Sequence, residues 1–206
     1  MTSISIIGSG KMGAAIAEVA TRAGAGVQIV KRSATSPSAA RPDFDYGVMG
    51  DALIGGLVVL AVPYSAYPSI VEHYGEQLAE RVVIDISNPI DFSTYDELRS
   101  PADSSTAAEL AGLLPEGAAV VKAFNVNLGD TLTSGTNGTT TTTVLFAGDY
   151  ADAKMAVAAL IEASGMRAVD VGPLTRAREL EAMGFLQIVM AALGKTRYES
   201  GFALLP

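Results

Sequence analysis

The chain of 206 residues contains no cysteine, a single histidine and few basic residues. Without cysteine the protein has no disulfide, no thiolate metal ligand and no cysteine nucleophile. The histidine, His73, lies in the middle of a helical pattern, where solvent-exposed or core-edge histidines are far commoner than catalytic ones. The 14 basic residues are outnumbered by 22 acidic ones, and the resulting net charge of −8 argues against binding to nucleic acid.

Long apolar runs are also missing from the sequence. No stretch approaches the ~20 residues of a membrane-spanning helix, and no segment resembles a signal peptide, because the first predicted strand begins at residue 3. We therefore expect a cytoplasmic protein with no membrane partner. With 49% hydrophobic and 17% charged residues, a chain of this length can bury a sizeable core. It is predicted to form one large domain, or one domain with a modest C-terminal extension.

The most informative segment is a glycine-rich loop near the N-terminus. A β-branched run over residues 3–7 enters the pattern G-x-G-x-x-G, and an apolar pattern with helical spacing follows it. In this setting Gly8 allows a tight turn, Gly10 lets a pyrophosphate approach the backbone, and Gly13 lets the helix pack closely on its strand. The unpaired amides at the start of the helix attract phosphate. Rather than a purely structural turn, the loop predicts a dinucleotide site formed by Gly8, Ser9, Gly10, Lys11, Met12 and Gly13.

The residues after the second predicted strand, 27–30, indicate which dinucleotide binds. Lys31, Arg32 and Ser33 stand where NAD-preferring proteins have an acidic residue for the ribose hydroxyls. A guanidinium can bind a 2′-phosphate in a bidentate, charge-assisted way, whereas a carboxylate would repel it. The alternative is that Lys31 and Arg32 are ordinary solvated loop charges. Beside the glycine loop of an acidic chain, they favour NADP over NAD.

The rest of the sequence alternates strand and helix patterns. Continuous apolar runs such as 57–62 are typical of parallel strands that are buried on both faces. The segment between Ser33 and Gly56 is too short for a complete helix and strand, so this unit is predicted to be trimmed. Further strands are predicted over 81–86, 118–123, 139–146 and 167–171, with helices ending near Leu78 and Leu114 and others over 149–163 and 175–193. The alternation predicts an α/β fold with a doubly wound, mostly parallel Rossmann sheet and a small C-terminal helical extension.

Ligands bind to such sheets at the carboxyl ends of the strands. Backbone groups at these ends can hold ribose and nicotinamide, and asparagine amides can hold a carboxamide or a substrate carbonyl. The alternative is that the prolines start helices and the asparagines occupy turns. The further cofactor-binding residues predicted at the strand ends are Val62, Pro63, Tyr64, Asn88, Pro89, Ala123 and Asn125.

No side chain in this set offers convincing proton chemistry. No histidine–carboxylate dyad follows a strand, and Asp85 is interpreted as structural because it lies inside a buried strand. Alcohol oxidation usually needs a positioned proton acceptor, whereas hydride exchange between two heterocyclic cofactors depends on positioning and electrostatics. We therefore assign no catalytic side chain and no metal ligand.

The chain resembles the F420-dependent NADP oxidoreductases, small proteins that pass hydride between NADP and a deazaflavin. A related resemblance is to the cytosolic reductase domain of the Steap metalloreductases, which pairs NADP with a flavin. The resemblance extends over nearly the whole chain and is most specific in its C-terminal part. It rests on residues 8–13, 31–33, 61–64, 87–89, 104–110, 121–125, 146–149, 170–174 and 177–181.

The resemblance implies roles for the predicted site residues. Ser9, Arg32 and Ser33 would hold the 2′-phosphate, residues 62–64 would line the nicotinamide site, and the deazaflavin would pack near residues 123–127 under the C-terminal helix. It also implies a homodimer formed through C-terminal helices. We accordingly expect an NADP-binding Rossmann domain over residues 1–172. A helix and tail over residues 173–206 would pack on the same domain and contribute to the dimer interface.

Three functions are compatible with these residues. The first, which we favour, is an NADP-dependent oxidoreductase that uses F420 or a flavin as its second cofactor or substrate. The second is an NADPH-dependent reductase of a small carbonyl or imine. The third is a non-catalytic NADP-binding regulator, which the missing acid–base groups leave open.

Overall fold

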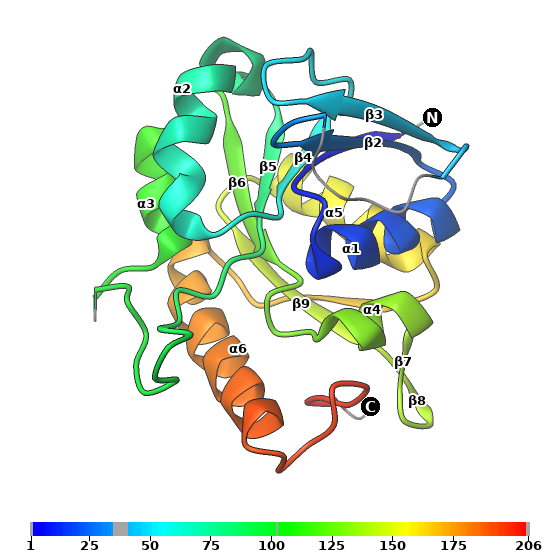
Figure 1. Ribbon diagram of the computed structural model, residues 1–206, viewed down its shortest axis with the longest axis vertical. Helices are drawn as coiled ribbons and strands as arrows, with labels where there is room; N and C mark the ends of the chain where they lie inside the picture. The colour runs from blue at the N-terminus through cyan, green and yellow to red at the C-terminus, as the bar shows by residue number, and fades with distance from the viewer. Residues whose placement is uncertain (1, 35–40, 102, 205–206) are drawn as a thin grey trace.

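An eight-stranded sheet crosses the centre of the molecule in the computed structural model, which describes residues 2–34, 41–101 and 103–204 (Figure 1). The strand order is β10-β9-β6-β5-β4-β1-β2-β3, and every pair of neighbours is parallel except β6 with β9. This confirms the predicted doubly wound, mostly parallel Rossmann sheet. The strands are β1 (Ser3–Ile7), β2 (Gly26–Lys31), β3 (Phe44–Val48), β4 (Leu57–Leu60), β5 (Val82–Asp85), β6 (Ala119–Ala123), β9 (Thr143–Gly148) and β10 (Arg167–Asp170).

Helices cover both faces of the sheet (Figure 1). Helices α1 and α5 pack on one face, and α2 and α3 pack on the other. Short 3-10 turns η1 (Tyr64–Ala66) and η2 (Leu174–Arg176) lead into α2 and α6. The helices are α1 (Lys11–Arg22), α2 (Tyr67–Leu78), α3 (Thr106–Leu113), α4 (Gly129–Ser134), α5 (Ala151–Ala163) and α6 (Ala177–Ala192).

Strand β4 shows why the central strands are continuously apolar. Leu57 and Val59 belong to the core layer under α1 and α5, whereas Val58 and Leu60 belong to the layer under α2 and α3. Successive side chains of a strand point to opposite faces, so a strand covered on both faces needs apolar residues at every position. All four residues are buried accordingly.

The structure departs from the predicted elements at β3, at the start of β9 and at α4. The trimmed unit after β2 contains a strand, β3, which was not predicted, and its residues 35–40 lie outside the described part of the chain. The strand predicted over 139–146 begins at Thr143, because the preceding threonines form a small hairpin of β7 (Thr136–Asn137) and β8 (Thr140–Thr141). Helix α4, before this hairpin, was not predicted either.

Helix α6 begins against the sheet and projects beyond it (Figure 1). Its first turns are buried through Ala177 and Leu180, and the chain after it turns back toward the β7–β8 hairpin. There the side chain of Asn137 bonds to the backbone of Gly201 and Phe202. Within the described residues, no helix is both long and apolar enough to cross a membrane.

Candidate functional site

The glycine loop lies where β1 ends and α1 begins, and two of its glycines are required by the protein's own packing. Gly8 has φ +121°, and a Cβ there would overlap the carbonyl oxygen of Ala61 at the end of β4. A Cβ at Gly13 would overlap the carbonyl oxygen of Gly8. These two glycines therefore let the loop, β4 and the start of α1 approach one another closely.

Gly10 differs from the other two glycines. A Cβ at this position would meet no heavy atom within 4 Å. Gly10 is the N-cap of α1, where no side chain caps the first-turn amides and no acidic residue lies in the first turn. Packing within the protein therefore does not require glycine at this position. A ligand that reaches the first-turn amides would, however, have to pass the place where a Cβ would stand, so glycine keeps that path open.

A long cleft runs past Gly10 along the carboxyl ends of the strands. It consists of two adjoining cavities of about 500 Å³ and 480 Å³, which share Gly10, Ala61, Val62 and Pro63. The first, the Arg32 cavity, is lined by residues that include Ser9, Arg32, Met49 and Ile70. The second, the Asn88 cavity, is lined by residues that include Lys11, Met12, Tyr64, Ser87, Asn88, Ile90 and Phe92. Each volume is in the range of small-molecule sites.

The cations predicted near the phosphates are placed differently from one another. Arg32 is exposed and lines the same cavity as Ser9. Lys31 instead lies with its ammonium 5.5 Å from the ring centre of Tyr46, and neither Lys31 nor Ser33 lines either cavity. Lys11 is bound to Asp130 at 2.9 Å. The structure therefore brings Ser9 and Arg32 together, and the predicted role of Ser33 stays a prediction.

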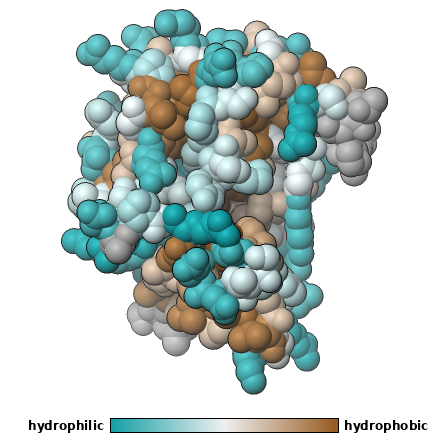
Figure 2. Space-filling view, turned by 60° about the vertical axis from the view of Figure 1, so that its left-hand side comes forward, coloured by the Kyte–Doolittle hydropathy of each residue, from teal (hydrophilic) through white to brown (hydrophobic). Residues whose placement is uncertain are grey.

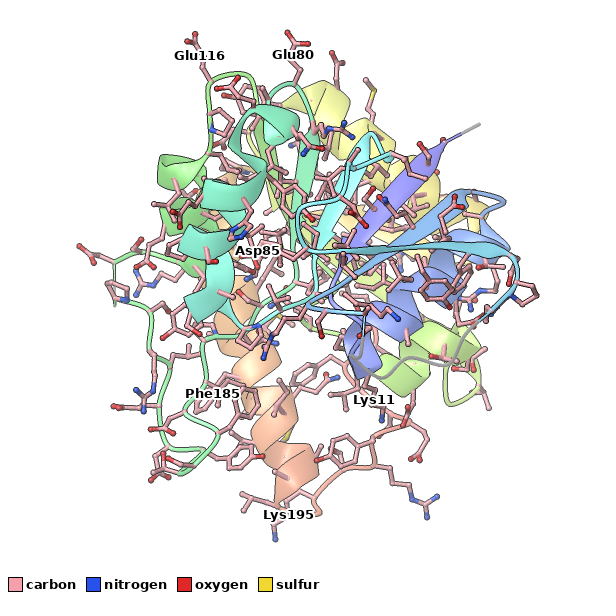
Figure 3. The ribbon with its side chains drawn as sticks, turned by 45° about the horizontal axis from the view of Figure 1, so that its top comes forward. Lys11, Glu80, Asp85, Glu116, Phe185 and Lys195 are labelled. Carbon is pink, nitrogen blue, oxygen red and sulfur yellow. The ribbon has the colours of Figure 1, made fainter. Side chains whose placement is uncertain are left out.

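Part of the chain's negative charge lies far from Lys11 and the glycine loop. Glu80 and Glu116 project from the end of the molecule opposite Lys11 (Figure 3). The net charge of −8 is thus compatible with an anion site at the cleft, because charges separated by more than about 10 Å in water are largely screened from each other.

The predicted strand-end asparagines form an interlocked pair. Asn88 donates from Nδ2 to the backbone oxygen of Asn125 at 2.7 Å, and Asn125 donates from Nδ2 to Oδ1 of Asn88 at 2.9 Å. Asn88 lines the cleft, whereas Pro89, Ala123 and Asn125 are buried and line neither cavity. Direct cofactor contact by these three residues stays a prediction.

A strained residue lies between the buried strand end and the asparagines. Phe124 is fully buried and has φ +63°, a left-handed conformation that bulky residues rarely adopt. Such strain persists when the surrounding structure over-determines it, and it is common at ligand sites. Here it turns the chain sharply between β6 and Asn125.

A buried charge cluster beneath the cleft was missed from the sequence, and Figure 3 labels one of its members, Asp85. Lys122 donates to Asp85 at 2.9 Å and to Glu181 of α6 at 3.0 Å, and all three side chains are inaccessible to solvent. Asp85 is thus structural, as predicted, but it is not alone. A signal was present, because Asp85 and Lys122 interrupt apolar strands and are partners in the register of β5 with β6. Buried opposite charges in register are expected to pair.

The cluster sets the protonation of Asp85 and Tyr67. Burial raises the pKa of Asp85, but the Lys122 charge and the hydrogen bonds from Tyr67 and Ser87 outweigh burial and hold this pKa below its ordinary value. Burial, together with the negative charge of Asp85, raises the pKa of the Tyr67 hydroxyl. Tyr67 therefore stays protonated and donates its hydrogen bond to Asp85.

His73 lines neither cavity, although it contacts Ser69, which lines the Arg32 cavity. His73 is exposed on α2, with Nδ1 2.8 Å from the carbonyl oxygen of Ser69. Among the described residues, no group of histidines and carboxylates is arranged to hold a metal ion.

The fold and the cleft define a dinucleotide-binding α/β protein. A family model described as NADP oxidoreductase, coenzyme F420-dependent, matches residues 3–89, which include the glycine loop, Arg32 and Asn88. Residues 3–89 are thus similar to a family of NADP-dependent oxidoreductases.

Individual relatives are similar to this chain over longer stretches. Metalloreductase STEAP3 of Rattus norvegicus is 30% identical over 185 residues, which are 87% of this chain and 36% of STEAP3. The F420-dependent NADP reductase of Methanocaldococcus jannaschii is 29% identical over 133 residues, which are 63% of this chain and 59% of that protein. The matched region thus spans less than two thirds of either relative. A candidate F420-dependent NADP reductase from Arthrobacter sp. FB24 has a similar solved structure, with a TM-score of 0.85 at 26% identity, covering 98% of this chain and 99% of that one.

Proposed function

We propose that this protein transfers hydride between NADP(H) and a planar deazaflavin or flavin acceptor. The observation that carries the proposal is Gly10, which lies at the junction of the two cavities and has open space where a Cβ would be. A dinucleotide has two ends joined by a pyrophosphate, and the cleft has two cavities joined beside a helix N-terminus. The residues present therefore fit such a cofactor.

Different residues of the cleft bind different parts of the cofactor. The α1 amides at Gly10 bind the pyrophosphate, and Arg32 with Ser9 binds the 2′-phosphate of the adenosine end in the Arg32 cavity. Val62, at the shared wall, excludes water, and Asn88 orients the nicotinamide end in the Asn88 cavity. When bound, NADP(H) supplies or accepts the hydride at the nicotinamide ring.

The Asn88 cavity has few groups that could act as a protein acid, the Tyr64 hydroxyl among them. Among the described residues that line it, Lys11 is the one charged residue, and its ammonium is already paired with Asp130. Lys122 is fully buried and engaged with two carboxylates. Hydride transfer between stacked heterocycles requires positioning rather than a general acid, so we place the deazaflavin or flavin in this cavity.

We also propose that a second copy of the chain covers the projecting part of α6. Leu186 of α6 and Leu193, the C-cap residue of this helix, are 51% and 66% exposed and lie seven residues apart. Hydrophobic side chains gather at this lower end of the molecule (Figure 2). A homodimer would bury them. Replacing both leucines by aspartate should convert a dimer to a monomer in light-scattering measurements, and a monomeric unmodified protein would refute this part of the proposal.

An assay of acceptors tests the proposed reaction. The protein is incubated with NADPH or NADH and, in separate reactions, with F420, FMN, a ferric chelate or a small cyclic imine, and nicotinamide absorbance is followed. We expect oxidation of NADPH in preference to NADH, with F420 or FMN as acceptor. If NADPH binds tightly but is oxidised only when the imine is present, the acceptor is an imine and not a deazaflavin or flavin. If NADPH binds and is oxidised with none of the acceptors, the protein is a regulator.

A further inference from the structure

Helix α6 is anchored in the protein interior by one carboxylate. Oε1 of Glu181 accepts hydrogen bonds from the backbone nitrogen of Thr106 at 3.0 Å, its hydroxyl at 2.6 Å and Lys122 Nζ at 3.0 Å. Oε2 of Glu181 is buried and has no hydrogen-bond partner. A buried carboxylate separated from its donors is costly, so these bonds hold the start of α6 firmly at β6 and the N-terminus of α3.

Lys122 extends this anchor to the loop after β5. Its ammonium donates to the carbonyl oxygen of Ser87 at 2.6 Å, in addition to its bonds with Asp85 and Glu181. Ser87 and Asn88 both line the Asn88 cavity. One buried ammonium therefore connects α6 with the wall of the cleft.

One turn after Glu181, α6 contacts the same loop directly at Gly184. A Cβ on Gly184 would overlap Oδ1 of Asn88 and lie 2.8 Å from the carbonyl oxygen of Asn125. Residues three apart on a helix share a face, so an anchored Glu181 keeps Gly184 against the asparagine pair. Asn125 also donates from Nδ2 to the carbonyl oxygen of Leu180, the residue before Glu181, at 2.9 Å.

We propose that Glu181 is a positioning residue for the nicotinamide end of the cleft. Bound to Lys122 and Thr106, it fixes α6 so that Gly184 and the Leu180 carbonyl hold Asn88 and Asn125 in one arrangement. Contacts within the chain support the ordering of the 86–90 loop by Glu181. The effect of that ordering on hydride transfer rests on the proposed function.

Two substitutions of Glu181 separate this role from a general structural one. Glu181→Ala removes the acceptor for Thr106 and Lys122 and leaves Lys122 paired with Asp85. Glu181→Gln keeps an acceptor at Oε1 and replaces Oε2, which makes no hydrogen bond. Glu179→Gln changes an exposed carboxylate of the same helix, paired with Arg176, and serves as the matched control.

Amide hydrogen exchange of the free protein is the first measurement. We expect Glu181→Ala to speed exchange in the 86–92 segment, and Glu181→Gln and Glu179→Gln to leave it near the unmodified rate. Unchanged exchange in Glu181→Ala would overturn the proposal. This measurement needs no cofactor, so it stands even if the unmodified protein fails to bind NADPH, a result that would refute the proposed function alone.

Binding and turnover are the second measurement. We expect Glu181→Ala to lower kcat about ten- to hundredfold, while the dissociation constant of 2′,5′-ADP, which lacks the nicotinamide, stays within about twofold. Glu181→Gln should restore most of kcat. An equal loss of 2′,5′-ADP affinity would indicate general disruption and overturn the proposal. Should Glu181→Ala fail to fold, Gly184→Ala leaves the charge cluster intact and must show the same selective loss.

Discussion

Replacing Gly10 by alanine should separate cofactor binding from folding. A Cβ at Gly10 meets no heavy atom within 4 Å, and the backbone angles φ −76° and ψ −177° suit alanine without strain. A glycine-to-alanine change typically stabilises by about 0.4–1 kcal/mol through the unfolded chain, while alanine is a poorer N-cap than glycine by roughly 0.5–1 kcal/mol. These effects nearly cancel. We therefore expect the free energy of unfolding to change by less than about 1 kcal/mol.

The same methyl group should weaken NADPH binding substantially. It would stand in the open space through which a pyrophosphate reaches the α1 amides, and overpacking of this kind costs about 1–3 kcal/mol. That energy corresponds to a dissociation constant roughly 5- to 150-fold higher. NADPH fluorescence titration measures the affinity, and thermal unfolding of the same samples measures the stability.

Gly112→Ala is the matched control for this experiment. Gly112 also has open space around a Cβ, but it lies in α3 and outside both cavities. We expect it to leave NADPH affinity unchanged. If Gly10→Ala binds NADPH as tightly as the unmodified protein, the pyrophosphate does not pass Gly10 and the assignment of the cleft is wrong.

Three further substitutions or conditions test separate parts of the structure. Arg32→Ala should weaken the binding of NADPH by about 1–3 kcal/mol and leave the binding of NADH nearly unchanged, because the lost contact is to the 2′-phosphate. Equal losses of affinity in titrations with the two cofactors would refute this role of Arg32. Arg22 donates to the carbonyl oxygens of Leu132 at 2.7 Å, Thr133 at 2.8 Å and Ser164 at 3.3 Å. Arg22→Ala should therefore lower the free energy of unfolding, measured by urea denaturation, by roughly 2–4 kcal/mol. A loss below about 0.5 kcal/mol would show that these bonds contribute little to stability. The pKa of Asp85 in the folded protein lies below its ordinary value of 3.8, so its carboxylate stabilises the fold above that pH and loses this contribution as pH falls through the folded pKa. The urea midpoint should accordingly fall more steeply below about pH 4 in the unmodified protein than in Asp85→Asn, and parallel profiles would contradict the sign.

The central sheet and the glycine loop could be predicted because their signals are local. Apolar runs such as 57–62 indicate strands covered on both faces, and the spacing of Gly8, Gly10 and Gly13 between a strand and a helix is typical of a dinucleotide-binding turn. Strand β3 was missed although Phe44, Tyr46 and Val48 alternate with Asp45 and Gly47, a pattern typical of a strand with one face toward the core. The prediction for this segment depended on its shortness alone.

The missed parts of the site depend on contacts between residues distant in sequence. Glu181 lies 59 positions from Lys122, and its helical pattern resembles that of an exposed carboxylate such as Glu179. The threonine run before β9 has the composition of a strand throughout, but Thr140 and Thr141 pair with β7 across the turn at Gly138, which has φ +61°, and β9 begins only at Thr143. Tertiary context decides both cases.

A deuterium-transfer experiment tests the proposed hydride transfer most directly. NADPH deuterated at C4 in one configuration, and then in the other, is incubated with the protein and oxidised F420, and the reduced deazaflavin is analysed by mass spectrometry. We expect one of the two forms to pass its deuterium to the deazaflavin, because the cleft would present one face of the nicotinamide to the acceptor. NADPH that binds in the cleft but is oxidised by neither F420 nor FMN faster than without protein would contradict the proposal.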